Sequence, residues 1–502
     1  MEELTLLLNG FANLGQQPMA LLLAIFGVAV GIIIGALPGL TATMGVAIIL
    51  PFTFGMDTVS GLTMISGVYF GGVYAGSITA ILLRIPGTPA AAATAMDGFE
   101  LTKQGRAGEA LGVATFSSFI GGTLSILMLV FLSPILAGIA LKFSASETFA
   151  LAVFGLSIIA SISGKSLVKG LIAGFFGLLV ATIGLDPMGG FPRFTWGIPD
   201  LMNVPFIPVM IGLFAASEAF KTIAESDTLR TKAAELKRII PTKETFRRIW
   251  GTILRSAGLG AFIGSIPGAG ADIAAFVAYN EAKRFSKTPE NFGKGEVQAV
   301  AACEAGANGC TGGALLPMLT LGVPGDAVTA VMLGALTIQG LQPGPLLFKD
   351  HAPMVFTLFA GMLFCYLMML ILGLASLRFI GKILQMPKSV LTPLILALSI
   401  VGTYAINNST FDIGIMLVAG VIGYFMQKFD FPPSPIVLAL IMGPMAEANF
   451  RRALSLHNGS YDFLYTRPIT VAFLSLAIFS LCFPFIREYL RKRKLKQVET
   501  LV

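Results

Sequence analysis

Charged side chains, histidine and cysteine are all scarce in this sequence. Only 12% of the 502 residues are Asp, Glu, Lys or Arg, and there are two histidines and four cysteines. So few charges, beside 55% hydrophobic residues, exclude a soluble globular protein. His351 and His457 stand in no metalloprotease or hydrolase spacing, so no histidine-based enzyme is indicated. The cysteines show no paired spacing and predict neither a disulfide framework nor a metal site.

Long stretches of the chain contain no charged residue at all. Several exceed the roughly 20 apolar residues that a helix needs to cross a bilayer. The sequence therefore predicts an all-α polytopic membrane protein with about 10 to 14 transmembrane or re-entrant helices. The uncharged stretches are 4–56, 58–83, 110–141, 305–325, 352–377, 389–411 and 468–486.

Four proline–glycine pairs interrupt the apolar stretches in two matched sets. The segments 35–39 and 264–268 share the form Gly-x-x-Pro-Gly, and each is followed by a second pair, Pro86-Gly87 or Pro324-Gly325. Proline removes a backbone donor and glycine lets the chain turn, so each pair predicts a broken helix. In a membrane, such breaks survive only where protein or a wet cavity satisfies the freed backbone groups. We interpret them as two repeats of one unit; whether each break is a kinked span or a hairpin stays open.

The charges beside the breaks predict that the two repeats are inverted relative to one another. In the first unit, about 20–110, the loop near Asp57 has no positive charge, whereas the loop after the second break carries Lys103 and Arg106. In the second unit, about 253–350, the pattern is reversed. Its first loop has four basic residues between 283 and 294, and its second holds little but Lys349. By the positive-inside rule, equivalent loops lie on opposite sides, as an inverted-topology repeat requires.

These signals divide the chain into four parts. Residues 1–220 form a first repeat with scaffold helices, 221–252 a basic linker, 253–486 a second repeat with scaffold helices, and 487–502 a basic tail. The positive-inside rule places the linker and the tail in the cytoplasm. The lipid bilayer beside them explains their charge, so no nucleic-acid partner is expected.

The helices that restart after the breaks are expected to hold a substrate anion, because free N–H groups and the positive end of the helix dipole point at it. For Arg84, two alternatives stay open: pairing with a substrate carboxylate, or reaching from the helix to the membrane surface. Asn308, one helical turn from Glu304, either lines the substrate or ion path or joins two helices by a hydrogen bond. The candidate substrate-binding residues are Pro38, Gly39, Thr41, Thr43, Arg84, Pro86, Gly87, Thr88, Pro267, Gly268, Ala269, Gly270, Asn308, Pro324 and Gly325.

Three carboxylates, Asp272, Asp326 and Glu304, are candidates for ion coupling. A carboxylate at membrane depth is costly and commonly binds a proton or a cation. A sodium ion at Asp272 and Asp326 would also suit the carbonyl groups that a broken helix releases. Either aspartate could equally cap the helix that follows it, and the two roles are compatible. The expected coupling ion is Na⁺ or H⁺, and no cofactor is expected.

Longer motifs around the breaks make the chain resemble the large membrane subunit of the bacterial tripartite tricarboxylate transporters. The resemblance covers nearly the whole chain. Its motifs are Gly35-Ala36-Leu37-Pro38-Gly39, Tyr69-Phe70-Gly71-Gly72-Val73-Tyr74-Ala75-Gly76-Ser77, Pro86-Gly87-Thr88-Pro89, Ser265-Ile266-Pro267-Gly268-Ala269-Gly270 and Leu321-Gly322-Val323-Pro324-Gly325.

The resemblance implies a secondary transporter of the bacterial inner membrane, working with a small four-span membrane subunit and a periplasmic solute-binding protein. It also implies import of citrate and other carboxylates, driven by a sodium or proton gradient. We expect alternating access by an elevator-like displacement, with rocking as the alternative. Two other classes stay open, a carboxylate channel and an intramembrane enzyme, although Ser77 and Ser265 have no evident histidine partner. A homo-oligomer also stays open.

Overall fold

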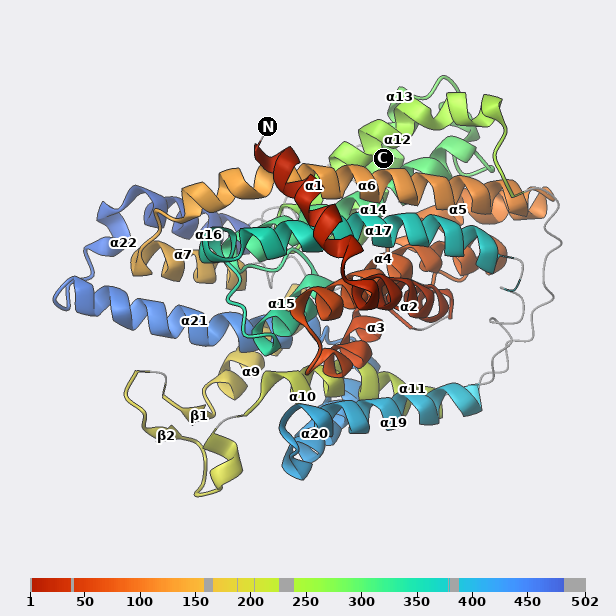
Figure 1. Cartoon of the computed structure of the whole chain (residues 1–502). Helices are drawn as coiled ribbons and strands as arrows, with labels where there is room; N and C mark the ends of the chain where they lie inside the picture. Colours follow the sequence, from red (N-terminus) through yellow and green to blue (C-terminus); the bar gives the residue numbers. More distant parts are fainter. Residues whose placement is uncertain are drawn as a thin grey trace, which may run out of the picture. The chain divides into compact units, whose positions relative to one another are not determined.

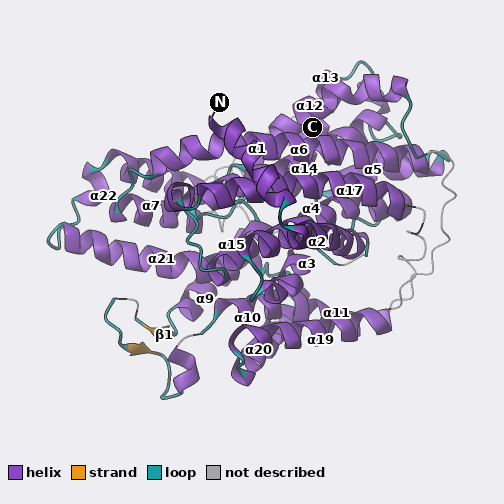
Figure 2. Ribbon diagram, viewed as in Figure 1, coloured by secondary structure: helices purple, strands orange, loops and turns teal. Residues whose placement is uncertain are grey.

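The computed structural model of the chain is built almost entirely from helices (Figures 1 and 2). It describes residues 2–37, 40–157, 166–186, 188–202, 204–224, 239–377, 379 and 388–482. Within these ranges, the sheet structure is one short antiparallel pair, β1 (Gly184–Leu185) with β2 (Pro192–Arg193). The predicted all-α class is therefore confirmed.

The described helices follow one another along the chain in this order. Up to residue 224 they are α1 (Glu2–Gly15), α2 (Pro18–Ala36), α3 (Ala42–Ile49), η1 (Leu50–Thr53), α4 (Thr58–Leu83), α5 (Ala91–Lys103), α6 (Ala107–Ala140), α7 (Ala145–Ser157), α9 (Leu167–Ala181), η2 (Pro199–Met202), α10 (Phe206–Ile211), η3 (Gly212–Ala216) and α11 (Ser217–Ala224). From residue 243 they are α12 (Lys243–Gly264), α13 (Gly270–Phe285), η4 (Pro289–Asn291), α14 (Val297–Leu321), α15 (Ala327–Ile338), α16 (Pro345–Asp350), α17 (Ala352–Ser376), α19 (Lys388–Asn407), α20 (Thr410–Lys428), α21 (Ser434–Leu456) and α22 (Phe463–Thr466), followed by a helix over Pro468–Cys482.

Six segments of the described chain are long and apolar enough to cross a membrane. Shorter apolar helices accompany them, among them α3 and α15, which follow two of the breaks. Long spans mixed with short apolar helices are what a protein with re-entrant segments requires. The six candidate spans are Pro18–Ala36, Thr58–Leu83, Ala107–Ala140, Phe206–Ala224, Ala352–Ser376 and Thr410–Lys428.

The chain packs into two compact units. One comprises Met1–Leu141 and Ile207–Ile422, and the other Lys142–Phe206 and Gly423–Val502. All four breaks belong to the first unit. The repeat and linker boundaries at 220, 252 and 486 remain predictions from the sequence. Residues 225–238 of the basic linker and the whole tail 487–502 lie outside the described residues.

Helices α2 and α4 pack so closely that glycine is needed between them. A Cβ atom at Gly27 would lie 2.1 Å from the carbonyl oxygen of Met64, and one at Gly35 would lie 2.3 Å from that of Gly72. Such distances leave no room for a side chain, and small residues allow this approach between membrane helices. The contacts advance together along both helices, so α2 and α4 run in the same direction.

After α2 the chain turns back on itself. Ala42, at the start of α3, contacts Gly72 in the middle of α4, whereas Thr53, at the end of η1, contacts Gly61 near the start of α4. Segment α3–η1 therefore runs antiparallel to α4. The first break is thus a hairpin whose tip lies beside the middle of α4.

Helix α12 packs on α14 as α2 packs on α4. A Cβ atom at Gly260 would lie 2.2 Å from the carbonyl oxygen of Gly306, and one at Gly264 would lie 2.3 Å from that of Cys310. The two helices therefore run in the same direction, with the same need for glycine.

Helix α13 then returns along α14, as α3 returns along α4. Ala274, near the start of α13, packs with Cys310, and Ala278, one turn later, lies against Gly306. The third break is therefore a second hairpin, with its tip beside the middle of α14.

The second break of each repeat dips back toward the middle of the preceding helix. The N–H of Gly87 donates a hydrogen bond to the carbonyl oxygen of Gly76, at 3.1 Å. In the second repeat, a Cβ atom at Gly325 would lie 2.5 Å from the Cα atom of Ala314. Both breaks of each repeat thus meet the middle of α4 or of α14.

The two repeats are inverted relative to one another. Asp97 of α5, the helix that runs on past the end of α4, accepts hydrogen bonds from the backbone at 293–296, just before α14 begins. At the opposite end, Gln339 Nε2, after α15, donates to the carbonyl oxygen of Thr53, just before α4 begins, at 2.9 Å. The end of each long helix therefore lies near the start of the other. Figure 1 shows α3 and α15 side by side, as their contacts require.

The second unit is held by helix α21, which packs on α7 and α9. Phe463 is fully buried and packs with Ala145 and Ala453. An ion-pair network joins Asp186 and Arg193, of the loop after α9, to Glu447 and Arg451 of α21, at 2.7–3.5 Å. These charged pairs fix the β1–β2 loop onto its unit.

Candidate substrate and ion site

The two breaks of the second repeat touch through their backbones. The N–H of Gly268 donates a hydrogen bond of 2.7 Å to the carbonyl oxygen of Gly325. Gly268 has φ +81°, a conformation that glycine adopts without strain. The contact satisfies a donor and an acceptor that the broken helices leave free. Gly270 also has positive φ, and Ala269 precedes the first turn of α13.

The two breaks of the first repeat approach one another in the same way. A Cβ atom at Gly87 would lie 2.4 Å from the carbonyl oxygen of Gly35 and 2.9 Å from the Cα atom of Gly76. Pro38 and Gly39 lie outside the described residues. The predicted sites Gly87, Gly268 and Gly325 are therefore all buried at points where two chain segments meet.

The restarting helices present different groups in the two repeats. Thr41 caps α3, and its Oγ1 accepts a hydrogen bond of 3.2 Å from the N–H of Met44. Thr43 is half-buried in the first turn of α3. Thr88 is 7% exposed, and its Oγ1 has no hydrogen-bond partner among the described residues. A buried hydroxyl without a partner is costly, so this group is available for a ligand or water.

In the second repeat the corresponding positions carry carboxylates. Asp326 caps α15 in a capping box with Thr329, its Oδ1 accepting from the Thr329 N–H at 2.8 Å. Its Oδ2 accepts a hydrogen bond of 2.6 Å from the hydroxyl of Tyr69, a fully buried residue of α4. Both oxygens of Asp326 are therefore engaged. Asp272 lies exposed in the first turn of α13, where its negative charge interacts favourably with the positive end of the helix dipole.

Arg84 and the prolines of the breaks differ in how far they are buried. Arg84 ends α4 with φ +58°, is exposed, and places its guanidinium 5.9 Å from the ring centroid of Phe99. It stands two helical turns beyond Gly76, about 12 Å along the axis. Pro86 is exposed, Pro267 half-buried and Pro324 buried. The structure thus brings Gly268 close to Gly325 and Gly87 close to Gly35, and it leaves Arg84 at the end of α4.

Glu304 occupies the interior of α14 and is 2% exposed. Its Oε1 accepts a hydrogen bond of 2.5 Å from Thr94 of α5, and its Oε2 accepts one of 3.0 Å from Ser118 of α6. Asn308, one turn further, donates from Nδ2 to the Glu304 carbonyl oxygen at 3.2 Å. The Asn308 Oδ1 is buried with no partner among the described residues.

Asp97 joins the two repeats at the start of α14. Its carboxylate is 1% exposed and accepts backbone hydrogen bonds from Gly293, Gly295 and Glu296 at 2.7–2.9 Å, together with one from the Tyr279 hydroxyl at 3.0 Å. A carboxylate in such a nest of N–H groups is strongly held. Asp97 therefore fastens the α13–α14 loop to α5.

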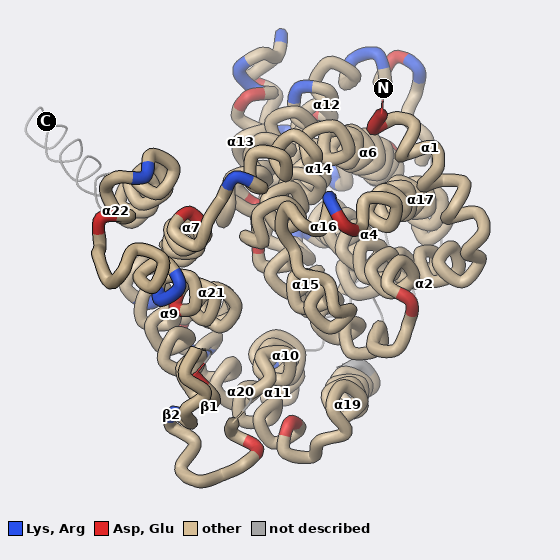
Figure 3. Tube along the Cα trace, turned by 60° about the vertical axis from the view of Figure 1, so that its left-hand side comes forward, with Lys and Arg blue, Asp and Glu red and all other residues tan. Residues whose placement is uncertain are grey.

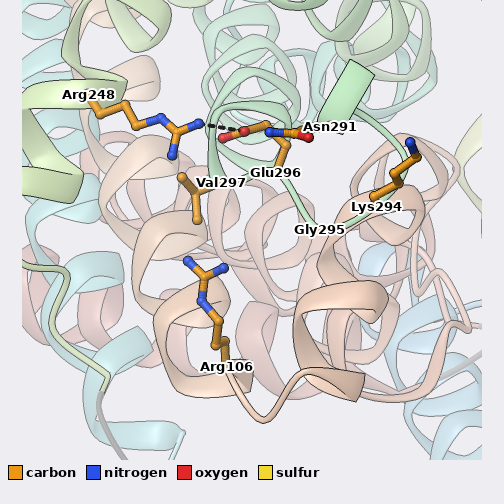
Figure 4. A pocket seen from close by; sticks show the side chains of 7 residues that line it. All are labelled: Arg106, Arg248, Asn291, Lys294, Gly295, Glu296 and Val297. Atoms are coloured by element: carbon orange, nitrogen blue, oxygen red, sulfur yellow. Dashed lines mark hydrogen bonds and ion pairs between the residues drawn. The ribbon is translucent and has the colours of Figure 1, made fainter. Parts of the chain in front are cut away.

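A polar pocket of about 210 Å³ opens beside the backbone segment that donates hydrogen bonds to Asp97. Figure 4 shows Arg248 pointing at Glu296, an ion pair of 2.6 Å, with Arg106 across the pocket. Gln104 Nε2 donates to the Lys294 carbonyl oxygen at 2.8 Å, so two loops that the sequence assigns to the same membrane side meet here. Figure 3 shows Lys and Arg gathered around the ends of α12 and α13. The pocket is lined by Arg106, Arg248, Asn291, Lys294, Gly295, Glu296 and Val297.

Four residues of the site were not predicted from the sequence: Tyr69, Asp97, Thr94 and Ser118. Tyr69 lies in a motif that supported the resemblance, but its partner Asp326 is far along the chain. A charged residue in a small-residue helix was the signal that could have identified Asp97. Thr94 and Ser118 carry no such signal, because hydroxyls are common in membrane helices and usually bond to their own backbone.

Comparison with known proteins agrees with these features. A model of the "Tripartite tricarboxylate transporter TctA family" matches residues 21–438. The chain is 35% identical over 462 residues, 92% of each chain, to an uncharacterized 52.8 kDa protein of the TAR-I ttuC' 3' region of Agrobacterium vitis. It is 33% identical over 219 residues, 44% of this chain and 90% of the relative, to an uncharacterized protein of the TAR-II ttuC' 3' region of the same organism. No solved structure matches significantly. This chain belongs to the tripartite tricarboxylate transporter TctA family.

Proposed function

We propose that this chain is the membrane subunit through which citrate-like tricarboxylates or dicarboxylates are imported, driven by a sodium or proton gradient. A small four-span membrane subunit and a periplasmic solute-binding protein complete the transporter. The binding protein delivers the carboxylate, and this chain carries it across the inner membrane. The family is one of transporters, not of enzymes.

The observation that carries this proposal is the meeting of the two breaks of each repeat beside the middle of α4 or α14. A new helix begins after each break, and the positive end of its dipole points back toward the break. Discontinuous helices in inverted repeats form the substrate and ion sites of many secondary transporters. The positive end of a helix dipole suits the negative charge of a carboxylate.

The two repeats differ in the charge of the residues that follow their breaks, and this difference suggests which repeat binds the anion. The restarts of the first repeat carry the neutral hydroxyls of Thr41, Thr43 and Thr88, whereas those of the second carry Asp272 and Asp326. An anion next to Asp326 would meet repulsion between like charges. We therefore assign the substrate carboxylates to the first repeat, beside Thr41 and Thr88. The candidates for cation binding are the carboxylates of the second repeat, Asp272, Asp326 and Glu304.

Import then proceeds by alternating access. The repeats form the mobile part, which exposes the site to one side of the membrane and then to the other by an elevator-like displacement. The central linker and the C-terminal tail, both basic, lie in the cytoplasm. The α13–α14 loop and the Lys103–Arg106 loop share that side.

Transport by reconstituted protein tests the function. Proteoliposomes containing this chain and its small subunit, with the binding protein outside, receive an imposed sodium or proton gradient and labelled citrate or dicarboxylates. Accumulation above the outside concentration that requires both the gradient and the binding protein supports the proposal. Equilibration without accumulation identifies a channel, and absence of flux for every carboxylate contradicts the substrate class.

A further inference from the structure

The carboxylate of Glu304 lies among hydroxyl groups from three helices. Thr94 of α5 and Ser118 of α6 donate to its two oxygens at 2.5 and 3.0 Å. The hydroxyl of Ser77 of α4 also interacts with this carboxylate, while donating to the Tyr74 carbonyl oxygen at 2.7 Å. Thr94, Ser118 and Ser77 are each at most 1% exposed. The site therefore joins α14 of one repeat to α4, α5 and α6 of the other half of the sequence.

No positive charge balances this carboxylate among the described residues. Within those ranges Glu304 forms no ion pair with Lys, Arg or His. The titratable groups that face it are Tyr74 of α4 and Cys303 of α14, neither of them basic. From α5 and α6 it meets the neutral Thr94 and Ser118. A buried carboxylate without a positive partner is unfavourable unless a proton or a cation neutralises it.

We infer that Glu304, with Thr94, Ser118 and Ser77, is a binding site for one monovalent cation, a proton or a sodium ion. This inference rests on the proposed function only in assigning that cation to coupling. The carboxylate supplies one negative charge, matching one positive charge. The hydroxyl groups of Thr94, Ser118 and Ser77 offer oxygen ligands, which suit a hard cation. Because the Ser77 hydroxyl donates to a carbonyl, its own oxygen keeps lone pairs toward the site.

The position of the site links its occupancy to the substrate breaks. Thr94 belongs to α5, the helix that restarts after Pro86-Gly87, and Thr88 lies just before it in the chain. When a cation binds, the hydroxyls of Thr94 and Ser118 turn from donors toward the carboxylate into ligands or acceptors. Cation binding therefore changes how α5 is held against α14. This is a direct route from ion binding to the break at Gly87.

Asp326 has a structural role, because it caps α15 and anchors this helix to α4. Both its oxygens are occupied, one by the capping box of α15 and the other by the Tyr69 hydroxyl. A cation there would have to displace these donors. At Glu304 the donors are flexible hydroxyls, which serve a cation as well as a carboxylate. The geometry thus favours Glu304 over Asp326 for the cation.

Cation binding to the purified full-length chain in nanodiscs tests the site without any transport assay. Binding of ²²Na⁺ is measured for the wild type, Glu304→Gln, and the double variant Thr94→Val/Ser118→Ala. Ser125→Ala is the matched control, because it removes a buried hydroxyl two turns along α6 that donates to the Gly122 carbonyl oxygen. Infrared difference spectra over a pH titration are recorded on the same four proteins, to detect a buried protonated carboxyl.

Two results support the inference and identify the cation. Saturable ²²Na⁺ binding that Glu304→Gln abolishes, and that the double variant weakens at least tenfold, identifies sodium. A carboxylic-acid band that Glu304→Gln removes and the double variant shifts, without ²²Na⁺ binding, identifies the proton. Ser125→Ala behaves as wild type in both cases. If Glu304→Gln, monodisperse in nanodiscs, keeps wild-type ²²Na⁺ binding and the same band, or if wild type shows neither signal, the inference is wrong. A lack of carboxylate transport with an intact Glu304 signal would instead refute the proposed function.

Discussion

The backbone N–H of Gly268 and the carbonyl oxygen of Gly325 are joined by a hydrogen bond of 2.7 Å, although the two residues belong to different broken helices. Each glycine sits where a side chain would collide or strain the backbone. A Cβ atom at Gly325 would lie 2.5 Å from the Cα atom of Ala314, and Gly268 has φ +81°. The two breaks of the second repeat are therefore one structural unit, and its geometry depends on both glycines.

Substitution of Gly325 by alanine should separate the break from α14 and abolish uptake. Overpacking of this kind typically costs about 1–3 kcal/mol, which leaves room for a folded protein. We expect uptake to fall at least tenfold while the amount of protein in the membrane stays close to wild type. Gly258→Ala in α12 is the control, since no atom lies within 4 Å of a Cβ atom there. Wild-type uptake by Gly325→Ala would show that the close contact is dispensable.

Replacement of Tyr69 by phenylalanine should weaken the attachment of α4 to the second break. The lost hydrogen bond of 2.6 Å goes to a carboxylate, and such bonds contribute about 1.5–3 kcal/mol. We expect a lower thermal midpoint of the purified chain, measured by intrinsic fluorescence. Tyr461→Phe, which removes an exposed hydroxyl, should leave the midpoint unchanged. Equal midpoints for Tyr69→Phe and wild type would mean that the bond contributes no net stability.

Asp97→Asn should release the α13–α14 loop. The asparagine amide has one acceptor oxygen, whereas the aspartate carboxylate has two charged ones. The backbone N–H groups of Gly293, Gly295 and Glu296 therefore lose hydrogen-bond partners, which costs about 3 kcal/mol of stability. Faster hydrogen exchange at residues 293–296 is the expected result. Glu100→Gln, on the same helix, removes a surface pair with Lys103 that contributes little, and should exchange as wild type. Unchanged exchange in Asp97→Asn would contradict this role.

The β1–β2 loop of the second unit should resist acid until low pH. Backbone hydrogen bonds from Gly189 and Met188, together with Arg451, hold the pKa of Asp186 below its usual value. A carboxyl with a lowered folded-state pKa contributes stability above its unfolded pKa of about 3.9, and loses it as pH falls through the folded value. Protease cleavage within 188–202 should therefore be constant from pH 7 to pH 5, and rise only below about pH 4. Asp186→Asn should show the fast cleavage at every pH; a wild-type rise near pH 6 would exclude Asp186 as the cause.

Asp272→Asn should change the ion dependence of uptake more than its dependence on carboxylate. Asp272 lies exposed in the first turn of α13, close to the meeting point of the breaks. A shift in the sodium or proton concentration for half-maximal uptake, with an unchanged carboxylate KM, is expected. Unchanged ion dependence in both Asp272→Asn and Asp326→Asn would remove these aspartates from the ion site.

Much of the architecture could be predicted because the relevant signals are local. Pro-Gly pairs in apolar stretches, and the charges beside them, indicated broken helices and inverted repeats, which α4 and α14 confirm. The Gly-x-x-Pro-Gly form did not distinguish a hairpin from a kinked span. That depends on whether the next helix returns along its neighbour, as Ala42 does beside Gly72.

The polar contacts of the site could not be predicted from the sequence. Glu304 was identified by its charge, but its donors Thr94 and Ser118 come from helices that are far away in the sequence. The same holds for Asp97, because its donors are backbone N–H groups, which every residue except proline has. Tertiary packing alone determines which hydroxyl or N–H faces a buried carboxylate.

Substrate protection of a cysteine at Thr43 tests most directly whether the paired breaks hold the carboxylate. Thr43 is half-buried in the first turn of α3 and does not cap the helix. Thr43→Cys is made in a Cys482→Ser background, because the other three native cysteines are buried, and Gln16→Cys, at an exposed turn, serves as the control. We predict that citrate or another transported carboxylate slows thiol modification at position 43 several-fold and leaves position 16 unaffected. Equal rates at position 43 with and without every carboxylate that the protein transports would contradict it.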